Sequence, residues 1–268
     1  MHLLLDIWGL RLMNSFNDVF KEKAFIGFIT AGDPDISSTE EFIYQMIEAG
    51  VSLIEIGIPF SDPIAEGKTI FNADMRALAK GTTTDMVFDM VKRIRNKYPS
   101  FTFVFMTYLN PVFSYGYDRF FKKAMEVGML GIIIPDLPFE ESFEVKDVAK
   151  KYNQVVISMI APTSKQRIAK IAKEAEGFIY LVSSLGVTGV RSEIKTDLES
   201  IVKEIRKYTN VPVAIGFGIS NEEAVAKMTK ISDGAIVGSA IVNIIEKYGK
   251  DSSPYVYDFC KRMVMAKN

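Results

Sequence analysis

The sequence predicts an α/β fold, a (β/α)8 TIM barrel with an extra N-terminal helix. Short runs rich in β-branched and aromatic residues recur along the 268 residues, helical patterns lie between them, and no linker or low-complexity tract divides the chain. Strand-like runs that alternate with helices are typical of a parallel sheet. Eight such units fit one barrel domain, which typically takes about 250 residues.

The strand-forming runs can be read in order. They are AFIGFIT (from Ala24), VSLIEIGI (from Val51), FTFVFMTY (from Phe101), GIIIPDL (from Gly131), VVISMIA (from Val155), GFIYLVSS (from Gly177), VPVAIGFG (from Val211) and GAIVGSA (from Gly234). A doubly wound open sheet is the alternative, but it would normally show a fingerprint such as GxGxxG after its first strand. That fingerprint is absent from the sequence.

The helices between the runs have recognisable ends. Ser220 with Glu223 and Thr163 with Gln166 have the spacing of a capping box, and the second helix after run two should end before Pro99. The extra helix is expected near residues 14–22. We expect residues 1–12 to be a non-native or disordered extension, because Met13 opens a polar and then amphipathic stretch, and residues 13–268 to form a single (β/α)8 barrel domain.

Composition excludes several classes of function. The net charge of -1 provides no basic surface for a nucleic acid, and no apolar run approaches the ~20 residues that span a bilayer. The single cysteine, Cys260, cannot form an internal disulfide, which suits a cytoplasmic protein. The only histidine is His2 near the N-terminus, so acid-base chemistry must use carboxylates, Tyr or Lys.

A candidate catalytic carboxylate stands near the end of the second run. Ile54, Ile56 and Ile58 alternate onto one face, which predicts packing against helices, while Val51, Leu53, Glu55 and Gly57 take the other face. Glu55 then points into the barrel mouth, where desolvation raises its pKa and suits it to acid-base work. A structural ion pair is the alternative, but none of the eight runs contains a basic residue. The same absence disfavours a Schiff-base lysine.

The loops at the predicted strand ends carry further candidates. The loop GIPFSDPIAEGKTI holds two acids, Asp62 and Glu66. For each of them, a functional role and a simple solvent-exposed position are about equally compatible with the sequence. GFGIS after run seven and VGSAIV after run eight predict a phosphate site, with tight turns as the alternative. SSLGVTGVRSE has glycine hinges typical of a lid, with an ordinary surface loop as the alternative. Tyr180, inside the sixth run, is a candidate site residue, with a core aromatic as the alternative.

Taken together, FITAGDPD, LIEIGIPFSDPIAEG, PDLPFEES, LGVTG, GFGIS and VGSAIV closely resemble the tryptophan synthase alpha chain family, in consistent order from about Met13 to the C-terminus. The resemblance implies a lyase that cleaves indole-3-glycerol phosphate into indole and glyceraldehyde 3-phosphate in tryptophan biosynthesis. It also implies an alpha2beta2 heterotetramer with a beta subunit, whose pyridoxal phosphate is the cofactor; the alpha chain itself needs no cofactor or metal.

The same resemblance assigns roles to individual residues. Glu55 matches the general acid-base, Glu66 the second carboxylate and Tyr180 the tyrosine beside the reacting centre. The remaining matches are Gly189, Gly218, Gly238 and Ser239 around the phosphate, Thr188 on the lid, Phe28, Met106, Ile133, Ile160 and Phe217 around the indole ring, and Asp62 as a partner contact.

The sequence departs from the family at two positions of the loop. The family normally has Asp where Glu66 stands and commonly Pro where Lys68 stands. A misplacement of about 1 Å can cost on the order of a hundredfold in rate, and Lys68 is placed to pair with Glu66 and mask it. Two alternatives therefore stay open: a mainly regulatory subunit with weak chemistry of its own, and a phosphate-binding barrel enzyme with Mg2+ at Asp33, Glu55 and Asp136.

Overall fold

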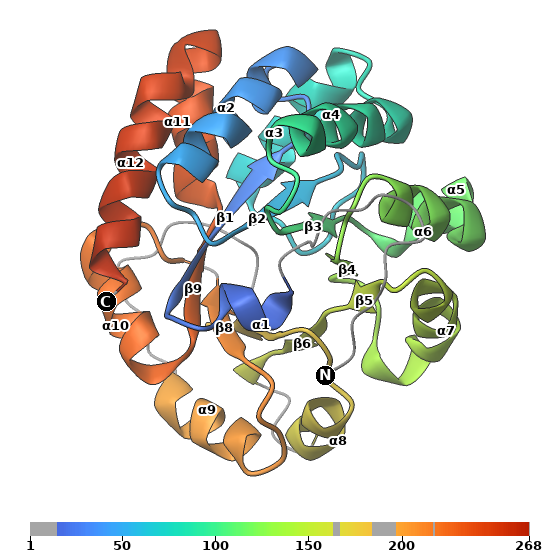
Figure 1. The fold of residues 1–268 in the computed structure, drawn as a ribbon, viewed down its shortest axis with the longest axis vertical. Coiled ribbons are helices and arrows are strands. Elements are labelled where there is room, and N and C mark those ends of the chain that lie inside the picture. Colours follow the sequence, from blue (N-terminus) through green and yellow to red (C-terminus); the bar gives the residue numbers. More distant parts are fainter. Residues whose placement is uncertain (1–14, 163–166, 184–196, 217, 268) are drawn as a thin grey trace.

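The strands of the protein form a nearly closed barrel that is surrounded by helices (Figure 1). The structure is a computed structural model, and it describes residues 15–162, 167–183, 197–216 and 218–267. The strands are β1 (Ala24–Thr30), β2 (Leu53–Gly57), β3 (Phe103–Met106), β4 (Gly131–Ile133), β5 (Val155–Val156), β6 (Ser158–Ile160), β7 (Ile179–Val182), β8 (Val213–Gly216) and β9 (Gly234–Val237). Each one coincides with or lies within one of the predicted runs, and all the pairings are parallel.

The run VVISMIA provides two of these strands because it pairs on both sides of the barrel in turn. The sheet order is β5-β4-β3-β2-β1-β9-β8-β7-β6, so its two edges are consecutive in the chain. The first part of the run pairs with β4 and the last part pairs with β7. Between them, Ile157 donates a backbone hydrogen bond of 2.9 Å to Ile132. One predicted strand thus spans the two edges of the sheet.

Helices surround the strands, and the first of them lies at one end of the barrel. They are α1 (Phe16–Val19), α2 (Ile36–Glu48), α3 (Lys68–Ala79), α4 (Thr84–Lys97), α5 (Leu109–Tyr115), α6 (Tyr117–Glu126), α7 (Phe143–Lys151), α8 (Ile168–Lys173), α9 (Leu198–Arg206), α10 (Glu222–Ile231), α11 (Ser239–Tyr248) and α12 (Ser253–Ala266), with short 3-10 helices at Phe139–Glu141 and Gly249–Ser252. Along the described residues, no helix has the length and apolar character needed to cross a membrane.

The predicted helix ends are partly right. α4 ends at Lys97, before Pro99, as expected. The predicted box of Ser220 and Glu223 is wrong, because Asn221 is the N-cap of α10 and accepts a hydrogen bond of 2.9 Å from the backbone of Ala224. An Asn one residue later competes successfully, since Asn is at least as good an N-cap as Ser. Thr163 and Gln166 lie outside the described residues.

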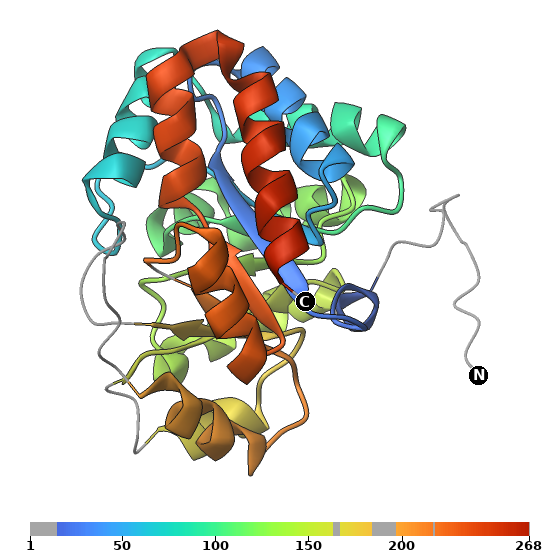
Figure 2. The same ribbon diagram turned by 90° about the vertical axis from the view of Figure 1, so that its left-hand side faces the viewer.

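The extra N-terminal helix lies across one end of the barrel. α1 is shorter than expected, and Ser15 and Asp18 form its capping box. The rings of Phe16 and Phe20 lie 5.9 and 5.6 Å from that of Phe178, the residue just before β7. Figure 2 shows α1 beside the start of β1, so this helix covers the amino-terminal end of the strands and leaves the carboxyl-terminal end for a site. The prediction about residues 1–12 stays a prediction, because they lie outside the described part.

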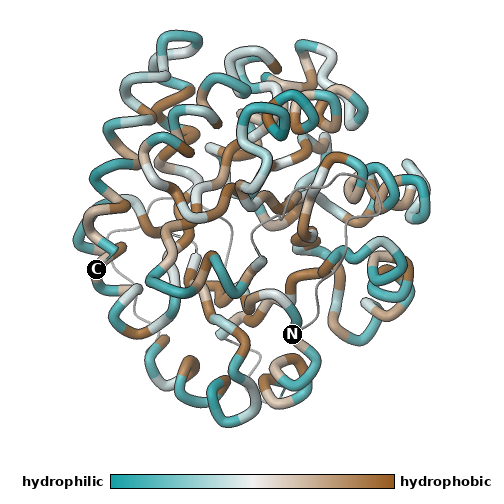
Figure 3. Tube along the Cα trace, viewed as in Figure 1, coloured by the Kyte–Doolittle hydropathy of each residue, from teal (hydrophilic) through white to brown (hydrophobic). Residues whose placement is uncertain are grey.

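The hydrophobic core has two layers that the strand alternation separates. Ile54, Ile56 and Ile58 belong to the outer layer between strands and helices, as predicted, and Leu53 belongs to the inner layer inside the barrel. Val51 also lies in the outer layer, contrary to prediction, because it precedes β2 and is not bound by the strand's alternation. In Figure 3 the hydrophobic colour concentrates on the strands and on the inner sides of the helices.

Candidate active site

A pocket is lined by residues from strand ends, loops and helices on several sides of the barrel. Its lining residues are Phe28, Glu55, Glu66, Ile70, Met106, Tyr180, Gly218, Ile219, Ile236, Gly238 and Ser239. Because Glu55 of β2 and Ser239, which follows β9, both line it, a carboxylate shares the pocket with a helix N-terminus two strands away in the sheet. The strand alternation therefore places Glu55 inside the barrel, as the sequence predicted.

Glu55 is a buried acid whose carboxyl group accepts no hydrogen bond from the part of the chain that the structure describes. It lies in β2 between Phe28 of β1 and Val104 of β3 in the strand register. The side chain is 1% exposed, and neither carboxyl oxygen has a hydrogen-bond partner among the described residues. Burial raises its pKa from 4.5 to about 8. With this pKa Glu55 is mostly protonated at neutral pH, and none of the ion pairs found among the described residues involves it, which disfavours the alternative of a structural ion pair.

Glu66 reaches the same cavity from the loop that follows β2. Burial raises its pKa to about 7, against backbone hydrogen bonds from Glu66 and Ala65 that lower it. The loop is anchored beside Glu66, since the backbone N–H of Ala65 donates a hydrogen bond of 2.8 Å to the hydroxyl of Tyr108. The expected pairing with Lys68 is not found: Lys68 is exposed, and no ion pair joins it to Glu66 in the described structure. Glu66 is therefore not masked by that lysine.

The opposite side of the cavity is formed by backbone. α11 begins at Ser239 with Gly238 as its N-cap, so the N–H groups of its first turn point toward the cavity end of the helix. Gly218 has a φ of +77°, a left-handed conformation that favours glycine. A helix N-terminus with glycines close by is a favourable place for a phosphate. None of the described residues that line the pocket is a Lys or an Arg, so on this side the pocket offers mainly backbone groups.

Two aromatic rings of the cavity lie directly over glycines of neighbouring strands. A Cβ atom on Gly216 would lie 2.4 Å from the hydroxyl oxygen of Tyr180, and one on Gly57 would lie 2.7 Å from the ring of Phe28. Tyr180 is buried, and burial, with the charges of Glu55 and Glu66, raises its pKa well above 10. Tyr180 is thus a neutral phenol that cannot serve as a base near pH 7.

The structure brings most, but not all, of the predicted site residues to this cavity. Those that line it are Glu55, Glu66, Tyr180, Phe28, Met106, Gly218, Gly238 and Ser239. Thr188, Gly189 and Phe217 lie outside the described residues, together with most of the predicted lid. Asp62 is exposed on the loop after β2 and accepts a hydrogen bond from the Ser61 hydroxyl.

The predicted aliphatic wall of the indole pocket differs from the observed one. Ile133 lies in the inner core layer but does not line the cavity. Ile160 belongs to the outer layer, because it pairs in register with Leu181, which faces the helices, whereas its neighbour Met159 pairs with Tyr180. The prediction that Ile160 lies around the indole ring is therefore corrected: its side chain belongs to the outer layer. Ile70, Ile219 and Ile236 take part in the lining instead.

Sequence reasoning also missed a third buried acid close to the cavity. Asp74 lies on α3, one helical turn after Ile70, and is 6% exposed. Burial first, and then the charge of Glu66, raises its pKa to about 8, while a backbone hydrogen bond from Phe60 lowers it. Its sequence signal is a charged residue in the apolar stripe that Ile70, Ala73 and Ala77 form at helical spacing.

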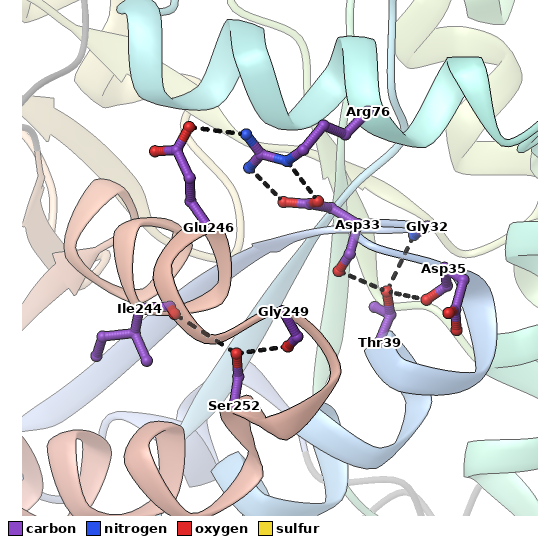
Figure 4. A network of polar contacts seen from close by, with 9 residues as sticks. All are labelled: Gly32, Asp33, Asp35, Thr39, Arg76, Ile244, Glu246, Gly249 and Ser252. Carbon is purple, nitrogen blue, oxygen red and sulfur yellow. Dashed lines mark hydrogen bonds and ion pairs between the residues drawn. The ribbon is translucent and has the colours of Figure 1, made fainter.

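The carboxylates of the hypothetical Mg2+ site do not come together. Figure 4 shows Asp33 bound by both arms of the Arg76 guanidinium, at 2.8 Å each, with Glu246 of α11 on the other side of the arginine at 2.9 Å. Asp136 accepts a hydrogen bond from the backbone of Leu109. Among the residues that the structure describes, no three acidic, His or Cys side chains gather as metal ligands. Asp33 instead links α3 to α11 through Arg76.

Comparison with known proteins agrees with this geometry. The family profile described as "Tryptophan synthase alpha chain" matches residues 16–266. The tryptophan synthase alpha chain of Lacticaseibacillus casei is 46% identical over 256 residues, which cover 95% of this chain and 96% of that protein. The crystal structure of the Legionella pneumophila alpha chain superposes with a TM-score of 0.85 at 34% identity, covering 95% and 97% of the two chains. A chain from the Pyrococcus furiosus tryptophan synthase complex superposes with a TM-score of 0.84 at 34% identity, covering 92% and 99%. The chain therefore belongs to the tryptophan synthase alpha chain family.

Proposed function

We propose that Glu55 and Glu66 carry out the alpha reaction of tryptophan synthase in this cavity. As an alpha chain, the protein is the lyase subunit that cleaves indole-3-glycerol phosphate to indole and glyceraldehyde 3-phosphate in tryptophan biosynthesis. The observation that supports these residue roles best is that a buried acid, Glu55, and a half-buried acid, Glu66, both with raised pKa values, line the same pocket as a helix N-terminus. That arrangement matches a substrate with an aromatic ring at one end and a phosphate at the other.

Glu55 begins the reaction as an acid. Its pKa of about 8 leaves it protonated at neutral pH, so it can donate a proton to C3 of the indole ring. The protonated ring then accepts the electron pair of the bond to the glyceryl side chain. When this bond breaks, the Glu55 carboxylate removes the proton of the side-chain hydroxyl, the aldehyde forms, and Glu55 is protonated again. The proton balance closes within one side chain.

Glu66 stabilises the positive charge that develops on the ring in this step. An ionised carboxylate near the ring N–H does so by electrostatics, and the effect is strong in a site that excludes water. Its pKa of about 7 means that a large fraction is ionised at neutral pH while Glu55 is still protonated. Two acids with different roles thus result from two different degrees of burial.

The substrate is held between apolar side chains and backbone amides. Phe28, Met106 and Tyr180 contact the indole ring, while Gly218, Gly238 and Ser239 bind the phosphate. The phosphate site extends to Gly189, with Thr188 on a closing lid and Phe217 at the ring, as the family resemblance implies. Holding the two ends fixes the scissile bond beside Glu55, which is the positioning that this chemistry requires.

The partner of the chain is a tryptophan synthase beta subunit, whose pyridoxal phosphate condenses the indole with serine. The segments after β2 and β3 expose Ile64 (74%) and Phe113 (67%), and Asp62, two positions before Ile64 in the sequence, is also exposed. Large apolar side chains exposed on the segments after two adjacent strands are compatible with a protein interface. Asp62 is accordingly a contact with this partner, in an alpha2beta2 tetramer. The alpha chain works without a cofactor of its own. The protein acts in the cytoplasm.

Glu55→Gln tests the catalytic assignment. The amide keeps the shape of the side chain and cannot transfer the proton, so indole release should fall by at least ~100-fold. Binding of indole-3-propanol phosphate, measured by calorimetry, should survive, because the phosphate end is intact. The matched control is Glu126→Gln at the exposed end of α6, which should turn over normally. Undiminished indole release by Glu55→Gln would reject the assignment.

A second candidate function follows from the residue at position 66. With Glu in place of the family's usual Asp, the chain would act mainly as a regulatory subunit that activates the beta partner and cleaves substrate slowly. Cleavage assays with and without a beta subunit separate the two readings. In the regulatory case Glu66→Asp raises the rate of the isolated chain, whereas in the catalytic case the longer side chain is already in place and Glu66→Asp lowers it.

A further inference from the structure

Tyr108 is a buried tyrosine next to the loop that carries Glu66. It is the N-cap residue of α5, and it is 3% exposed although it carries a polar hydroxyl. β3 pairs in parallel with β2, so the segment after β3 and the loop after β2 leave the same end of the barrel side by side. Glu66 lines the pocket from that loop, whereas Tyr108 does not line it. An effect of Tyr108 on the reaction must therefore act through a neighbouring residue.

The Tyr108 side chain contacts the loop at two places. Its ring lies 5.5 Å from the ring of Phe60, near the beginning of the loop. Its hydroxyl accepts a hydrogen bond of 2.8 Å from the backbone N–H of Ala65, the residue directly before Glu66. Gly67, the residue directly after Glu66, is the N-cap of α3. The backbone that carries Glu66 is therefore fixed on one side by a helix and on the other side by the Tyr108 hydroxyl.

Tyr108 is itself held in place by the residues on either side of it. The hydroxyl of Thr107 donates a hydrogen bond of 3.1 Å to the carbonyl of Ile58, directly after β2. The backbone N–H of Leu109 donates a hydrogen bond of 2.9 Å to the carboxylate of Asp136, after β4. The segment is thus bound to both neighbouring loops, and it presents the Tyr108 hydroxyl from a fixed position.

The part of the loop between the two contacts is poorly buried. Ser61, Asp62 and Ile64 are exposed, and Ile64 is exposed to 74%. A loop with few buried apolar contacts opens locally at a low cost in free energy. The hydrogen bond at Ala65 therefore matters more for the place of Glu66 than it would in a tightly packed segment.

We propose that Tyr108 is a positioning residue for the alpha reaction: its hydroxyl holds the backbone at Ala65, so that the Glu66 carboxylate keeps its place beside the indole ring. This proposal rests on the proposed role of Glu66. A misplacement of about 1 Å can cost on the order of a hundredfold in rate, so a hydroxyl that does not touch the substrate can still control the chemical step.

Tyr108→Phe removes the acceptor of this hydrogen bond and keeps the ring against Phe60. The kcat for cleavage of indole-3-glycerol phosphate should fall at least ~10-fold, because the Glu66 carboxylate is no longer held in place. KM, and the dissociation constant of indole-3-propanol phosphate measured by calorimetry, should change less than ~2-fold, because Tyr108 does not line the pocket. A kcat within ~2-fold of that of the unsubstituted chain, or a loss confined to KM, overturns the proposal.

Tyr98→Phe is the matched control. Tyr98 follows α4 and precedes β3, so it lies at the opposite end of this strand from Tyr108, and its hydroxyl donates a hydrogen bond of 2.8 Å to Glu48. This variant should keep both kcat and KM within ~2-fold. An equal loss of kcat in the two variants would mean that the place of the hydroxyl does not matter, and it would overturn the proposal.

The double variant identifies the group through which Tyr108 acts. In a Glu66→Gln background, Tyr108→Phe should lower the residual kcat less than ~2-fold, because no carboxylate remains to be positioned. The same loss of kcat in both backgrounds overturns the proposal. A Glu66→Gln variant that cleaves the substrate at the full rate would instead count against the proposed function.

Hydrogen exchange tests the contact itself, and it also covers the case in which the Tyr108 variant does not fold. In the unsubstituted chain the amide of Ala65 should exchange at least ~100-fold more slowly, relative to its intrinsic rate, than that of Ile64 in the same loop. In Tyr108→Phe this protection should be lost while the amides of β2 stay protected. Equal exchange at Ala65 and Ile64 in the unsubstituted chain overturns the proposal, whatever the outcome for Glu66→Gln.

Discussion

Glu55→Gln should change how the stability of the protein depends on pH. In the folded chain the pKa of Glu55 is about 8, whereas the ordinary value is 4.5, so the folded state holds this proton more strongly than the unfolded state does. A carboxyl group of raised pKa contributes stability that is fully present below pH 4.5 and is lost as the pH rises through 8. The acid is buried and has no hydrogen-bond partner among the described residues, so solvent screening does little to reduce the effect.

The size of the effect follows from the two pKa values. The difference between 8 and 4.5 is 3.5, and each unit corresponds to ~1.4 kcal/mol, so full ionisation of Glu55 costs the folded state on the order of 5 kcal/mol. Most of this is lost by pH 7, where the linkage relation gives ~3 kcal/mol. Gln does not titrate, so the stability of Glu55→Gln relative to the unsubstituted chain should rise by that amount between pH 4.5 and pH 7.

Urea unfolding followed by circular dichroism at several pH values between 4.5 and 8 measures this difference. Glu66 and Asp74 are present in both proteins, so their own pH dependence largely cancels when the two are compared. Glu126→Gln is the control, and its difference from the unsubstituted chain should be independent of pH in this range. A difference for Glu55→Gln that changes by less than ~1 kcal/mol would refute the burial argument for this acid.

Three further substitutions test other parts of the site. Tyr180→Phe removes a hydroxyl that stays neutral, so kcat should fall less than ~10-fold and its pH profile should keep its shape in steady-state assays; a displaced limb would contradict this. Gly216→Ala puts a Cβ atom 2.4 Å from the Tyr180 hydroxyl, and urea unfolding should show a loss of ~1–3 kcal/mol; unchanged stability would mean that the ring moves freely. Arg76→Met leaves the buried Asp33 carboxylate unpaired and should cost ~3 kcal/mol, whereas Arg262→Met, which breaks an exposed ion pair, should cost less than ~1 kcal/mol; equal losses would contradict the argument.

Strand alternation and turn chemistry made much of the barrel predictable. The runs of β-branched residues located every described strand, and the period of two placed Glu55 inside the barrel without any structural information. The rule fails just outside the strands, as Val51 shows, because a residue before the first ladder hydrogen bond is free to turn to the other side. The split of VVISMIA into β5 and β6 depends on which neighbours the run meets, and this is a property of the closed sheet.

The residues of the site that were missed come from helices and from close packing. Ile70 and Asp74 lie on the buried face of α3, whereas the residues that the sequence singled out lie at strand ends and in loops. Ile160 was carried over by resemblance, although its register partner Leu181 faces the helices. The Tyr180 side chain packs against Gly216, which is 36 positions later in the sequence (216 − 180). A single sequence gives no signal for such a contact.

The seating of Phe28 over Gly57 and of Tyr180 over Gly216 has a consequence for redesigning the substrate range. Each ring occupies the volume that a side chain on the adjacent strand would otherwise fill. A change in the size of the ring is therefore best combined with a change at the glycine. Truncating Phe28 alone opens a void above bare backbone, whereas truncating it together with Gly57→Ala transfers bulk from one strand to the next and moves the wall of the pocket. Libraries that vary these positions in pairs therefore reach pocket shapes that single-site libraries cannot.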